Sequence, residues 1–316
     1  MVPTEHEGQA EVGKRVNVPF GRQILEGFIL NIKDTCPDDI KIVEINSVVD
    51  EEIVLNEELI AIGEFIKEST LCSLSAAYQT MLPKALKASS KTQINKKFQS
   101  FLELNYSFEE AIKKCKNKIQ EEIVSTIESC GTIEKSEANE ISTSAVKTLL
   151  KNEVIKDVKE EVYRLDKKIL ECDKKKNLNK EQQNAVNEVI NHLGEHIKYL
   201  LHGVTGSGKT EVYMQIIDQV LKLEKNAIVL VPEISLTPQF VYNFKARFGD
   251  EIAVLHSGLS DGEKYDEWRK IAREEVKIVI GARSAIFAPI KNLGINYIEA
   301  PIKEYHEAFS IGLDKV

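Results

Sequence analysis

GVTGSGKT, at residues 203–210, is the stretch that decides the fold of this chain. It follows the apolar pair Leu200-Leu201 and precedes a helix-compatible run from 211 to 223. Glycines let successive backbone N–H groups converge on phosphate oxygens, and the positive end of the following helix favours the anion. The lysine of this pattern reaches the β- and γ-phosphates, and the next hydroxyl ligates Mg²⁺. The stretch therefore predicts a nucleoside triphosphate site made by Gly203, Thr205, Gly206, Ser207, Gly208, Lys209 and, through Mg²⁺, Thr210.

The composition indicates a globular protein with room for several domains. The chain has 316 residues, of which 42% are hydrophobic and 29% are charged, and this length suits two or three domains. No apolar run approaches the roughly 18 residues of a membrane span, and the first residues do not resemble a secretory signal. The five cysteines form no C-x-x-C pair, which argues against a disulfide framework or a zinc site. We expect a cytoplasmic protein that does not contact a membrane.

Positive charge is concentrated in one segment that also carries aromatic residues. Residues 1–60 hold five Lys and Arg against thirteen Asp and Glu, so they account for the whole net charge of −8. From Lys84 to Lys118, nine lysines stand against three glutamates, with four aromatic residues among them. Lysines neutralise phosphates and rings stack on bases, so this segment suits nucleic acid. An amphipathic helix with a solvated lysine face is the alternative, and composition alone favours it.

Periodicity separates a β-rich zone from a helical zone. Short β-branched runs at 15–21, 27–32 and 40–45, with turn residues between them, predict a small β-barrel or sandwich. Helical spacing dominates from 53 onwards. Near the end of that zone, residues 141–144 offer helix N-caps, and residues 154–163 indicate two short strands. A helix followed by a strand pair is the outline of a winged helix, and a helical packing domain with a β-hairpin is the alternative.

Beyond a charged linker at 166–176, helices alternate with short, continuous apolar runs. Such runs indicate a parallel sheet that is buried on both faces. We therefore predict an α/β multidomain fold with a small β-rich module at 1–60 and a helical or winged-helix module at 61–165. A P-loop lobe with a parallel sheet follows at 177–294, and a divergent tail at 295–316.

Three polar loops follow apolar runs of the P-loop lobe, with the sequences VPEISLTPQ (231–239), HSG (256–258) and GARSA (281–285). Because open α/β sheets bind ligands at the carboxyl ends of their strands, we expect these loops near the phosphate loop. Gln182 or Gln183, about twenty residues before the phosphate loop, has an amide that can read the edge of adenine. A kinase or GTPase is disfavoured, since no guanine-specific N-K-x-D stretch is present.

Seven stretches, in order along the chain, carry a resemblance to a known family. They are VNVPFGRQILEGFIL (16–30), DEEIVLNEEL (50–59), LCSLSAAYQTMLP (71–83), LLHGVTGSGKTEVYMQ (200–215), LVPEISLTPQ (230–239), VLHSGLSDGEKYDEWR (254–269) and IVIGARSAIFAPIKNLG (278–294). Through them the chain resembles the superfamily 2 DNA helicases, and specifically the primosomal protein N′ (PriA) family. The resemblance extends from Val12 to Gly294 and is far more specific than the phosphate loop alone.

The resemblance implies an ATP- and Mg²⁺-dependent 3′-to-5′ DNA helicase that acts on forked or single-stranded DNA at stalled replication forks. Primosome and single-strand-binding proteins would be its partners. Residues 1–60 would bind the 3′ end of a nascent strand, a winged helix would contact duplex arms, and a RecA-like first motor lobe would follow.

The resemblance also carries over roles for single residues. Gln183 matches the glutamine on the adenine side of the nucleotide. Lys96 and Lys97, in the lysine-rich segment, become candidate DNA contacts. The residues that match the loops tracking single-stranded DNA are Pro232, Glu233, Thr237, Pro238, His256, Ser257, Gly258, Arg283 and Ser284.

The sequence departs from the family pattern after Gly294. There the family continues into Asp-Glu-Glu-His, in which the Asp holds Mg²⁺ and the following Glu orients the attacking water. This chain reads Glu299-Ala300-Pro301-Ile302 instead, and Glu304, which follows a lysine four residues late, is only a weak catalytic candidate. Ala282 replaces the threonine that usually precedes Arg-Ser.

Further parts of the family pattern do not occur in this sequence. They are the second motor lobe with its ATP-site arginines, the cysteine cluster that binds zinc, and about one strand at the amino end. Since an arginine supplied across such a site contributes about 10³–10⁵ in rate, we expect nucleotide and DNA binding without a complete motor. A non-catalytic DNA-binding fragment with a structural P-loop lobe is the alternative.

Overall fold

The computed structural model describes residues 1–33, 35, 42–88, 94–165, 175–204 and 206–299, and the backbone of 307–311. The chain divides into two compact units, one formed by Met1–Ile94 with Lys167–Val316 and the other by Asn95–Asp166. The first unit holds an amino-terminal module and the P-loop lobe. Residues 61–94 belong to this unit, whereas the sequence grouped them with the helical zone.

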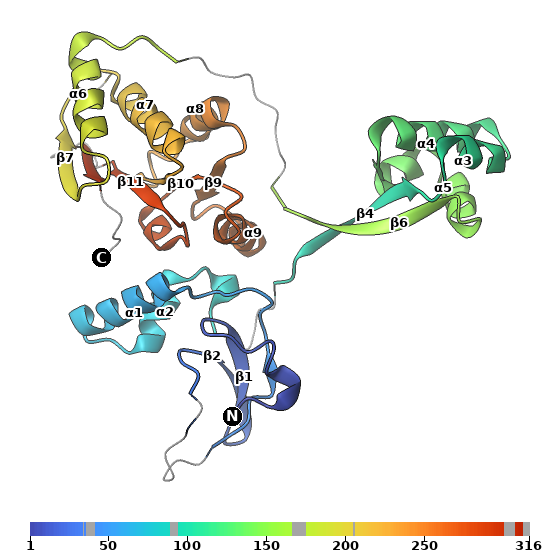
Figure 1. The fold of residues 1–316 in the computed structure, drawn as a ribbon, viewed down its shortest axis with the longest axis horizontal. Coiled ribbons are helices and arrows are strands. Elements are labelled where there is room, and N and C mark those ends of the chain that lie inside the picture. Colours follow the sequence, from blue (N-terminus) through green and yellow to red (C-terminus); the bar gives the residue numbers. More distant parts are fainter. Residues whose placement is uncertain are drawn as a thin grey trace. The chain divides into compact units, whose positions relative to one another are not determined.

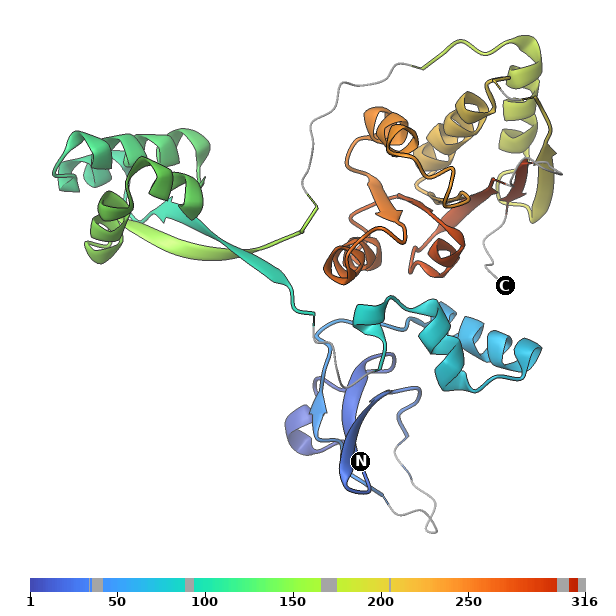
Figure 2. The ribbon, with the colours of Figure 1, turned by 180° about the vertical axis from the view of Figure 1, so that it is seen from behind.

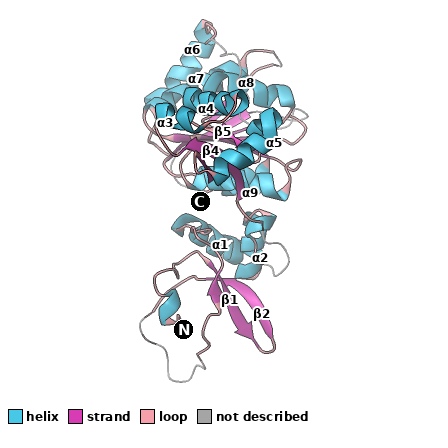
Figure 3. Cartoon of the chain, turned by 90° about the vertical axis from the view of Figure 1, so that its right-hand side faces the viewer, coloured by secondary structure: helices cyan, strands magenta, loops and turns pink. Residues whose placement is uncertain are grey.

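A small antiparallel sheet and two helices build the amino-terminal module. The strands are β1 (Arg15–Phe20), β2 (Gln23–Phe28) and β3 (Ser47–Val48), in the order β2-β1-β3. The helical elements are η1 (Thr4–His6), α1 (Glu57–Thr70), α2 (Leu74–Met81) and η2 (Lys84–Leu86). In Figure 3, β1 and β2 form a twisted hairpin, with α1 and α2 beyond one end of it.

The expected β-rich zone is present, although its second and third strands differ from the prediction. The hairpin already turns at Gly21, with φ of +61°, so the second strand occupies 23–28 instead of 27–32. Of the third expected strand, residues 42–45 are not in a strand, and 40–41 lie outside the described residues.

Buried polar contacts hold the module together. Arg15 is buried and binds the carboxylate of Asp50 through Nη2 at 2.6 Å and Nε at 2.9 Å. Its Nη1 also donates to the carbonyl oxygen of Ala85 at 3.2 Å. Arg15 therefore ties β1 to the segment that follows α2.

The second unit packs three helices against one sheet. Its strands are β4 (Lys97–Leu104), β5 (Ile133–Glu134) and β6 (Ile155–Val162), in the antiparallel order β5-β4-β6. Its helices are α3 (Phe108–Lys114), α4 (Lys118–Cys130) and α5 (Lys135–Lys151). Figure 2 shows these helices, in green, gathered at one end of the long β4–β6 ribbon. Leu102, Ile123 and Leu149 lie in their common core.

The structure corrects two predictions in this unit and confirms a third. The lysine-rich segment contains strand β4, because Lys97–Leu104 pairs along its whole length with β6. Residues 154–163 contribute one eight-residue strand and not two short ones. The expected N-cap is present, since α5 breaks at Ser142, whose Oγ accepts the N–H of Ala145 at 3.3 Å.

Alternating helices and strands form the P-loop lobe. Its strands are β7 (Ile197–Leu201), β8 (Asn226–Leu230), β9 (Ile252–Leu255), β10 (Ile278–Gly281), β11 (Leu293–Ile298) and β12 (Glu307–Ile311). Its helical elements are α6 (Lys180–Asn191), α7 (Lys209–Lys222), α8 (Pro238–Phe248), α9 (Asp261–Ala272) and η3 (Arg283–Phe287). The sheet order is β7-β12-β11-β8-β10-β9.

The parallel sheet predicted for this lobe is confirmed for β8 to β11, which are mutually parallel. Residues 295–298 continue β11, although the sequence placed them in the divergent tail. The phosphate-loop strand β7 joins the sheet through β12, which runs antiparallel to both β7 and β11. Two antiparallel steps restore the direction, so β7 runs the same way as the four parallel strands.

Both faces of this sheet are covered, as Figure 1 shows. Val229, Val254 and Ile280 point to the cluster that contains residues of α6, α7 and α8. Their neighbours Ile228 and Val279 point to the opposite cluster, which contains residues of α9 and η3. Alternate strand residues thus bury apolar side chains on opposite faces, which explains the continuous apolar runs in the sequence.

Candidate nucleotide and DNA sites

The predicted phosphate loop joins strand β7 to helix α7. Gly206 and Gly208 have φ of +79° and +82°, values that L side chains rarely adopt. A Cβ on Gly203 would lie 2.7 Å from Ser207 Oγ, so a larger residue there would require the Ser207 side chain to move. Thr205 lies outside the described residues. The backbone therefore favours glycine at two of the predicted positions, Gly206 and Gly208.

Lys209 and Thr210 form the first turn of α7, so the amino end of this helix faces the loop. Lys209 Nζ donates to the carbonyl oxygens of Gly203 at 2.9 Å and Val204 at 3.2 Å. The ammonium group thus lies inside the curve of the loop, and the Thr210 side chain is exposed beside it. A cationic lysine, a helix amino terminus and an exposed hydroxyl match the requirements of a Mg²⁺-bound phosphate chain.

The structure distinguishes between the two candidate glutamines, because only Gln182 contacts the phosphate loop. Its Nε2 donates to the carbonyl oxygen of Ser207 at 2.8 Å, and its Oε1 accepts the N–H of Asn179 at 2.9 Å in a capping box. Gln183, to which the resemblance assigned the adenine contact, instead donates to Asn187 Oδ1 on the same helix at 2.9 Å. The sequence contained the signal for Gln182. In an Asn-x-x-Gln capping box, the side chain of the glutamine at the third helical position bonds to the backbone of the N-cap residue, so it is directed toward the start of the helix.

The three predicted DNA loops follow β8, β9 and β10, which are parallel neighbours in the sheet. All three therefore emerge at one edge, which is also where β7 leads into the phosphate loop. The exposed residues in these loops are Glu233, Thr237, Pro238, Ser257, Gly258, Arg283 and Ser284, whereas Pro232 and His256 are half-buried. The structure thus brings the predicted nucleotide and DNA residues of this lobe to a common edge.

Local hydrogen bonds shape these loops. Thr237 Oγ1 caps α8 by accepting the N–H of Phe240 at 3.2 Å. His256 Nδ1 accepts the N–H of Gly258 at 3.1 Å, and Lys264 Nζ donates to the carbonyl oxygen of Ser257 at 3.1 Å. The loop at 256–258 is therefore held from α9, the helix that follows it.

An ion-pair network behind the phosphate loop was not predicted. Glu211, the residue after Thr210, accepts from Arg247 Nη2 at 3.2 Å and from the N–H of Lys176 at 3.2 Å. Asp218 also accepts from Arg247 at 3.2 Å and pairs with Lys175 at 2.9 Å. The end of the predicted linker thus binds α7 through a hydrogen bond and an ion pair. No sequence motif indicated these contacts.

The acidic pair expected by the family pattern would stand at the carboxyl end of β11. There, the N–H of Glu299 donates to the carbonyl oxygen of Leu230 at 2.8 Å, so the residue continues the sheet pairing. Glu304 lies outside the described residues. Within the described part of the chain, no group of three or more His, Cys, Asp and Glu residues is arranged to hold a metal ion.

Two lysines at the β4–β6 ribbon of the second unit, Lys96 and Lys156, lie beside carboxylates. Lys96 Nζ is 3.7 Å from Glu161 Oε2, and its side chain is largely covered. Lys97 is exposed at the start of β4. Across the ribbon, β6 presents Glu160 beside Gln99 and Asp157 beside Leu102. The β4–β6 ribbon is therefore of mixed charge and not uniformly basic.

Other positive groups of this unit are more open to solvent. Lys113, Lys116 and Lys118 are exposed where α3 meets α4. Lys147 is exposed on α5, next to the polar Thr143 and Ser144. These positions, rather than Lys96, have the exposure that phosphate contacts require.

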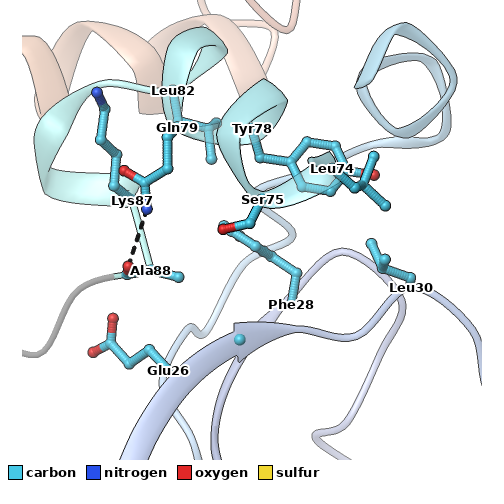
Figure 4. A pocket seen from close by; sticks show the side chains of 11 residues that line it. Glu26, Phe28, Leu30, Leu74, Ser75, Tyr78, Gln79, Leu82, Lys87 and Ala88 are labelled. Carbon is cyan, nitrogen blue, oxygen red and sulfur yellow. Dashed lines mark hydrogen bonds between the residues drawn. The ribbon is translucent and has the colours of Figure 1, made fainter. Parts of the chain in front are cut away.

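The amino-terminal module has a partly open cavity of about 210 Å³ between β2 and α2. Figure 4 shows Phe28 and Leu30 of the β2 side facing Leu74 and Tyr78 of α2, with Glu26, Gln79 and Lys87 toward the other end. The Tyr78 hydroxyl is buried without a hydrogen-bond partner, and burial raises its pKa. Most of the residues that line the cavity are apolar.

Comparisons with known proteins agree with both halves of the first unit. A family model described as the 3′ DNA-binding domain (3′BD) of PriA matches residues 1–83. A second model, described as the res subunit of type III restriction enzyme, matches residues 175–309.

Curated relatives match over most of the chain. The chain is 36% identical to the replication restart protein PriA of Bacillus subtilis, with 97% of this chain and 46% of the relative aligned. It is 34% identical to that of Chlamydia trachomatis, over 94% of this chain and 41% of the relative. To that of Synechocystis it is 46% identical over 49% of this chain. The chain thus spans less than half the length of these relatives.

The described residues contain no helix long and apolar enough to cross a membrane. The fold is the expected mixture of small antiparallel sheets and a parallel α/β sheet, and the phosphate loop and the three polar loops lie at one edge of the parallel sheet. With the 3′BD match at one end and relatives along nearly the whole sequence, the chain belongs to the PriA family of replication restart proteins.

Proposed function

We propose that this chain binds single-stranded and forked DNA together with Mg²⁺-ATP, as the DNA-binding part and first motor lobe of a 3′-to-5′ replication-restart helicase. One observation carries the proposal: the phosphate loop and the loops after β8, β9 and β10 share one edge of the sheet. A nucleotide and a DNA strand bound at that edge would contact the same rigid element.

In the nucleotide site, the residues of the phosphate loop and α7 would bind the phosphates and Mg²⁺. Lys209 would leave the carbonyl oxygens of Gly203 and Val204 to bind the β- and γ-phosphates. Thr210 would ligate Mg²⁺, and backbone N–H groups from 206 to 209 would bind phosphate oxygens. Gln182 would link the adenine side of the nucleotide to the loop through Ser207.

In the DNA site, exposed polar groups would hold the backbone of a single strand. Arg283 and Ser284 begin η3 with exposed side chains, and Thr237 and Ser257 stand in the neighbouring loops. The 3′BD match supports 3′-end binding by the amino-terminal module. Fork DNA, primosome proteins and single-strand-binding proteins would be the partners, in the bacterial cytoplasm.

Binding without turnover is the function we favour for this chain alone. In the sequence, Glu299-Ala300 follows β11 in place of an acidic pair, so the sequence offers no carboxylate pair at these two positions to hold the metal and orient water. A non-catalytic DNA-binding role, with the P-loop lobe serving as a scaffold, is the second candidate. That role predicts DNA binding with no measurable nucleotide affinity.

Equilibrium titrations would test the proposal. We expect the chain to bind a fluorescent ADP analogue in the presence of Mg²⁺ and to bind a 3′-tailed fork more tightly than a blunt duplex. Arg283→Ala should weaken binding to labelled oligo-dT. In a phosphate-release assay with forked DNA, turnover should stay far below about 1 s⁻¹, the low end of ordinary enzymes. Faster turnover, or an unchanged oligo-dT affinity in Arg283→Ala, would contradict the proposal.

A further inference from the structure

Helix α9 and the short element η3 of the P-loop lobe carry side chains that contact the amino-terminal module. Its Trp268 is 3% exposed and lies in an apolar cluster with Leu55, Leu59, Met81 and Leu86 of the module. Tyr265 of α9 and Phe287 of η3 pack against the same cluster. The module and the P-loop lobe are therefore joined by an apolar contact. Large aromatic side chains dominate the energy of such interfaces, so Trp268 should contribute most to it.

Ion pairs fix the two ends of α9 to the same module. Asp261, the first residue of the helix, pairs with Lys84 of η2 at 3.0 Å. Arg273, the C-cap of the helix, binds the Glu52 carboxylate through Nε at 3.1 Å and Nη2 at 2.5 Å. The module therefore holds α9 at its start, its middle and its end.

Helix α9 in turn holds the loop that precedes it. Lys264 donates to the carbonyl oxygen of Ser257, and Ser260 forms a capping box with Glu263 at the helix start. Buried Glu267 accepts the N–H of Val254 in β9 at 2.8 Å, which locks the helix to the strand before the loop. A displacement of α9 would therefore move the loop at 256–258.

Element η3 provides a second connection between the module and a DNA loop. Phe287, which packs on the module, ends the same short helix that begins with Arg283 and Ser284. Two of the three loops to which we assign DNA contacts are thus continuous with elements that rest on the module.

We infer that the amino-terminal module positions the DNA loops of the P-loop lobe through α9 and η3, with Glu52, Lys84 and Trp268 as positioning residues. The inference rests on the proposed DNA role of those loops. It assigns to the module a second task, besides any DNA that it binds itself: the lobe holds DNA tightly only while the module is docked on α9. Ordinary packing without this task would stabilise the fold and leave DNA affinity unchanged.

The two possibilities differ in the direction in which DNA affinity changes when negative charges are removed. Glu52→Gln with Asp261→Asn removes one partner from each ion pair and two negative charges, which should strengthen electrostatic attraction to DNA. If the ion pairs position the loops, DNA affinity should instead fall. Glu64→Gln with Glu68→Gln, on the exposed part of α1, removes the same charge away from α9 and serves as the matched control.

Fluorescence anisotropy with labelled oligo-dT, performed on the full chain, measures the effect. We expect the Glu52→Gln, Asp261→Asn variant to bind about fivefold more weakly, at the low end of couplings between sites, and the control to bind at least as tightly as the parent. Affinity for the fluorescent ADP analogue should stay unchanged in both, which shows that the lobe remains folded. Trp268 is the single tryptophan of the chain, so its emission reports directly on the interface and should shift to the red in the first variant.

The result with Arg283→Ala distinguishes the possible failures. If Arg283→Ala weakens DNA binding but the Glu52→Gln, Asp261→Asn variant does not, the loops bind DNA and the positioning role is wrong. If neither variant changes DNA affinity, the loops do not bind DNA, and both the proposed function of the lobe and this inference are overturned.

Discussion

The P-loop lobe and the second unit both carry sites predicted from sequence, yet only in the lobe does the prediction specify geometry. In the lobe, each motif residue has a fixed place after a strand, and the structure brings those places to one edge of a sheet. In the second unit, the prediction rested on the number of lysines, and Lys96 turns out to pair with Glu161 across the ribbon. Residue spacing therefore predicts where candidate residues lie in the fold, whereas composition does not reveal which opposite charges will lie next to the lysines.

The largest effect should come from the central lysine of the phosphate loop. Lys209→Ala removes the ammonium group that lies inside the loop. Since a hydrogen bond to a charged group contributes about 1.5–3 kcal/mol, affinity for Mg²⁺-ADP should fall by roughly 10-fold to 150-fold. Titration with a fluorescent ADP analogue measures this. Lys222→Ala, at the far end of the same helix, is the control and should change nothing, and equal affinities of the parent and Lys209→Ala would show that the loop binds no nucleotide.

A smaller effect should separate the two glutamines. Gln182→Ala removes the amide that donates to Ser207, so nucleotide affinity should fall by about fivefold to tenfold, as expected for loss of a neutral hydrogen bond of about 1 kcal/mol. Gln183→Ala breaks only a contact within α6 and should leave affinity unchanged. If Gln183→Ala has the larger effect, the assignment made from the resemblance is right and the contact with Ser207 is of little importance.

These glutamines also illustrate what the sequence could and could not predict. The phosphate loop, the α/β alternation and the N-cap at Ser142 depend on local spacing, and the structure contains all of them. The choice between Gln182 and Gln183 could be made from the Asn-x-x-Gln capping box, whereas the contact of Gln182 with Ser207 depends on which side of α6 faces the loop, which is a tertiary property. Strand β4 was missed because its pairing partner, β6, lies about fifty residues later in the chain, and lysines are depleted in strands.

The salt dependence of DNA binding should sharpen the comparison within the second unit. Replacing Lys113, Lys116 and Lys118 by Gln should lower the slope of log K against log salt by about 0.9 for each phosphate that these lysines neutralise in the parent. Lys96→Gln should change the slope little, because Glu161 already pairs with this lysine.

Charge reversal at Lys96 and Lys97 should weaken binding to all substrates, and exposed Lys97 should account for most of this loss. Gel-shift titrations at several salt concentrations, with forked and blunt substrates, measure the slopes. A larger effect of Lys96→Gln than of the triple variant would mean that the ribbon is the DNA surface.

The smallest effect concerns an ion pair that stabilises the second unit without any role in binding. Asp157 on β6 pairs with Lys135 at the start of α5, and this hydrogen bond holds the pKa of the Asp157 carboxyl below its usual value of 3.8. A carboxyl whose pKa is lower in the folded state stabilises the fold above the pKa of the unfolded state. That stabilisation is lost as the pH falls through the folded pKa. Because both side chains are partly exposed, Asp157→Asn should lower the unfolding free energy at pH 7 by less than about 1 kcal/mol and should have a smaller effect near pH 3.

Hydrogen exchange of the second unit, followed by mass spectrometry on the full chain, reports its local stability. Glu128→Gln, on the exposed side of α4, removes the same charge and should have no effect at either pH. An equal loss of protection in Asp157→Asn at both values of pH would mean that the side chain acts through packing and not through its charge.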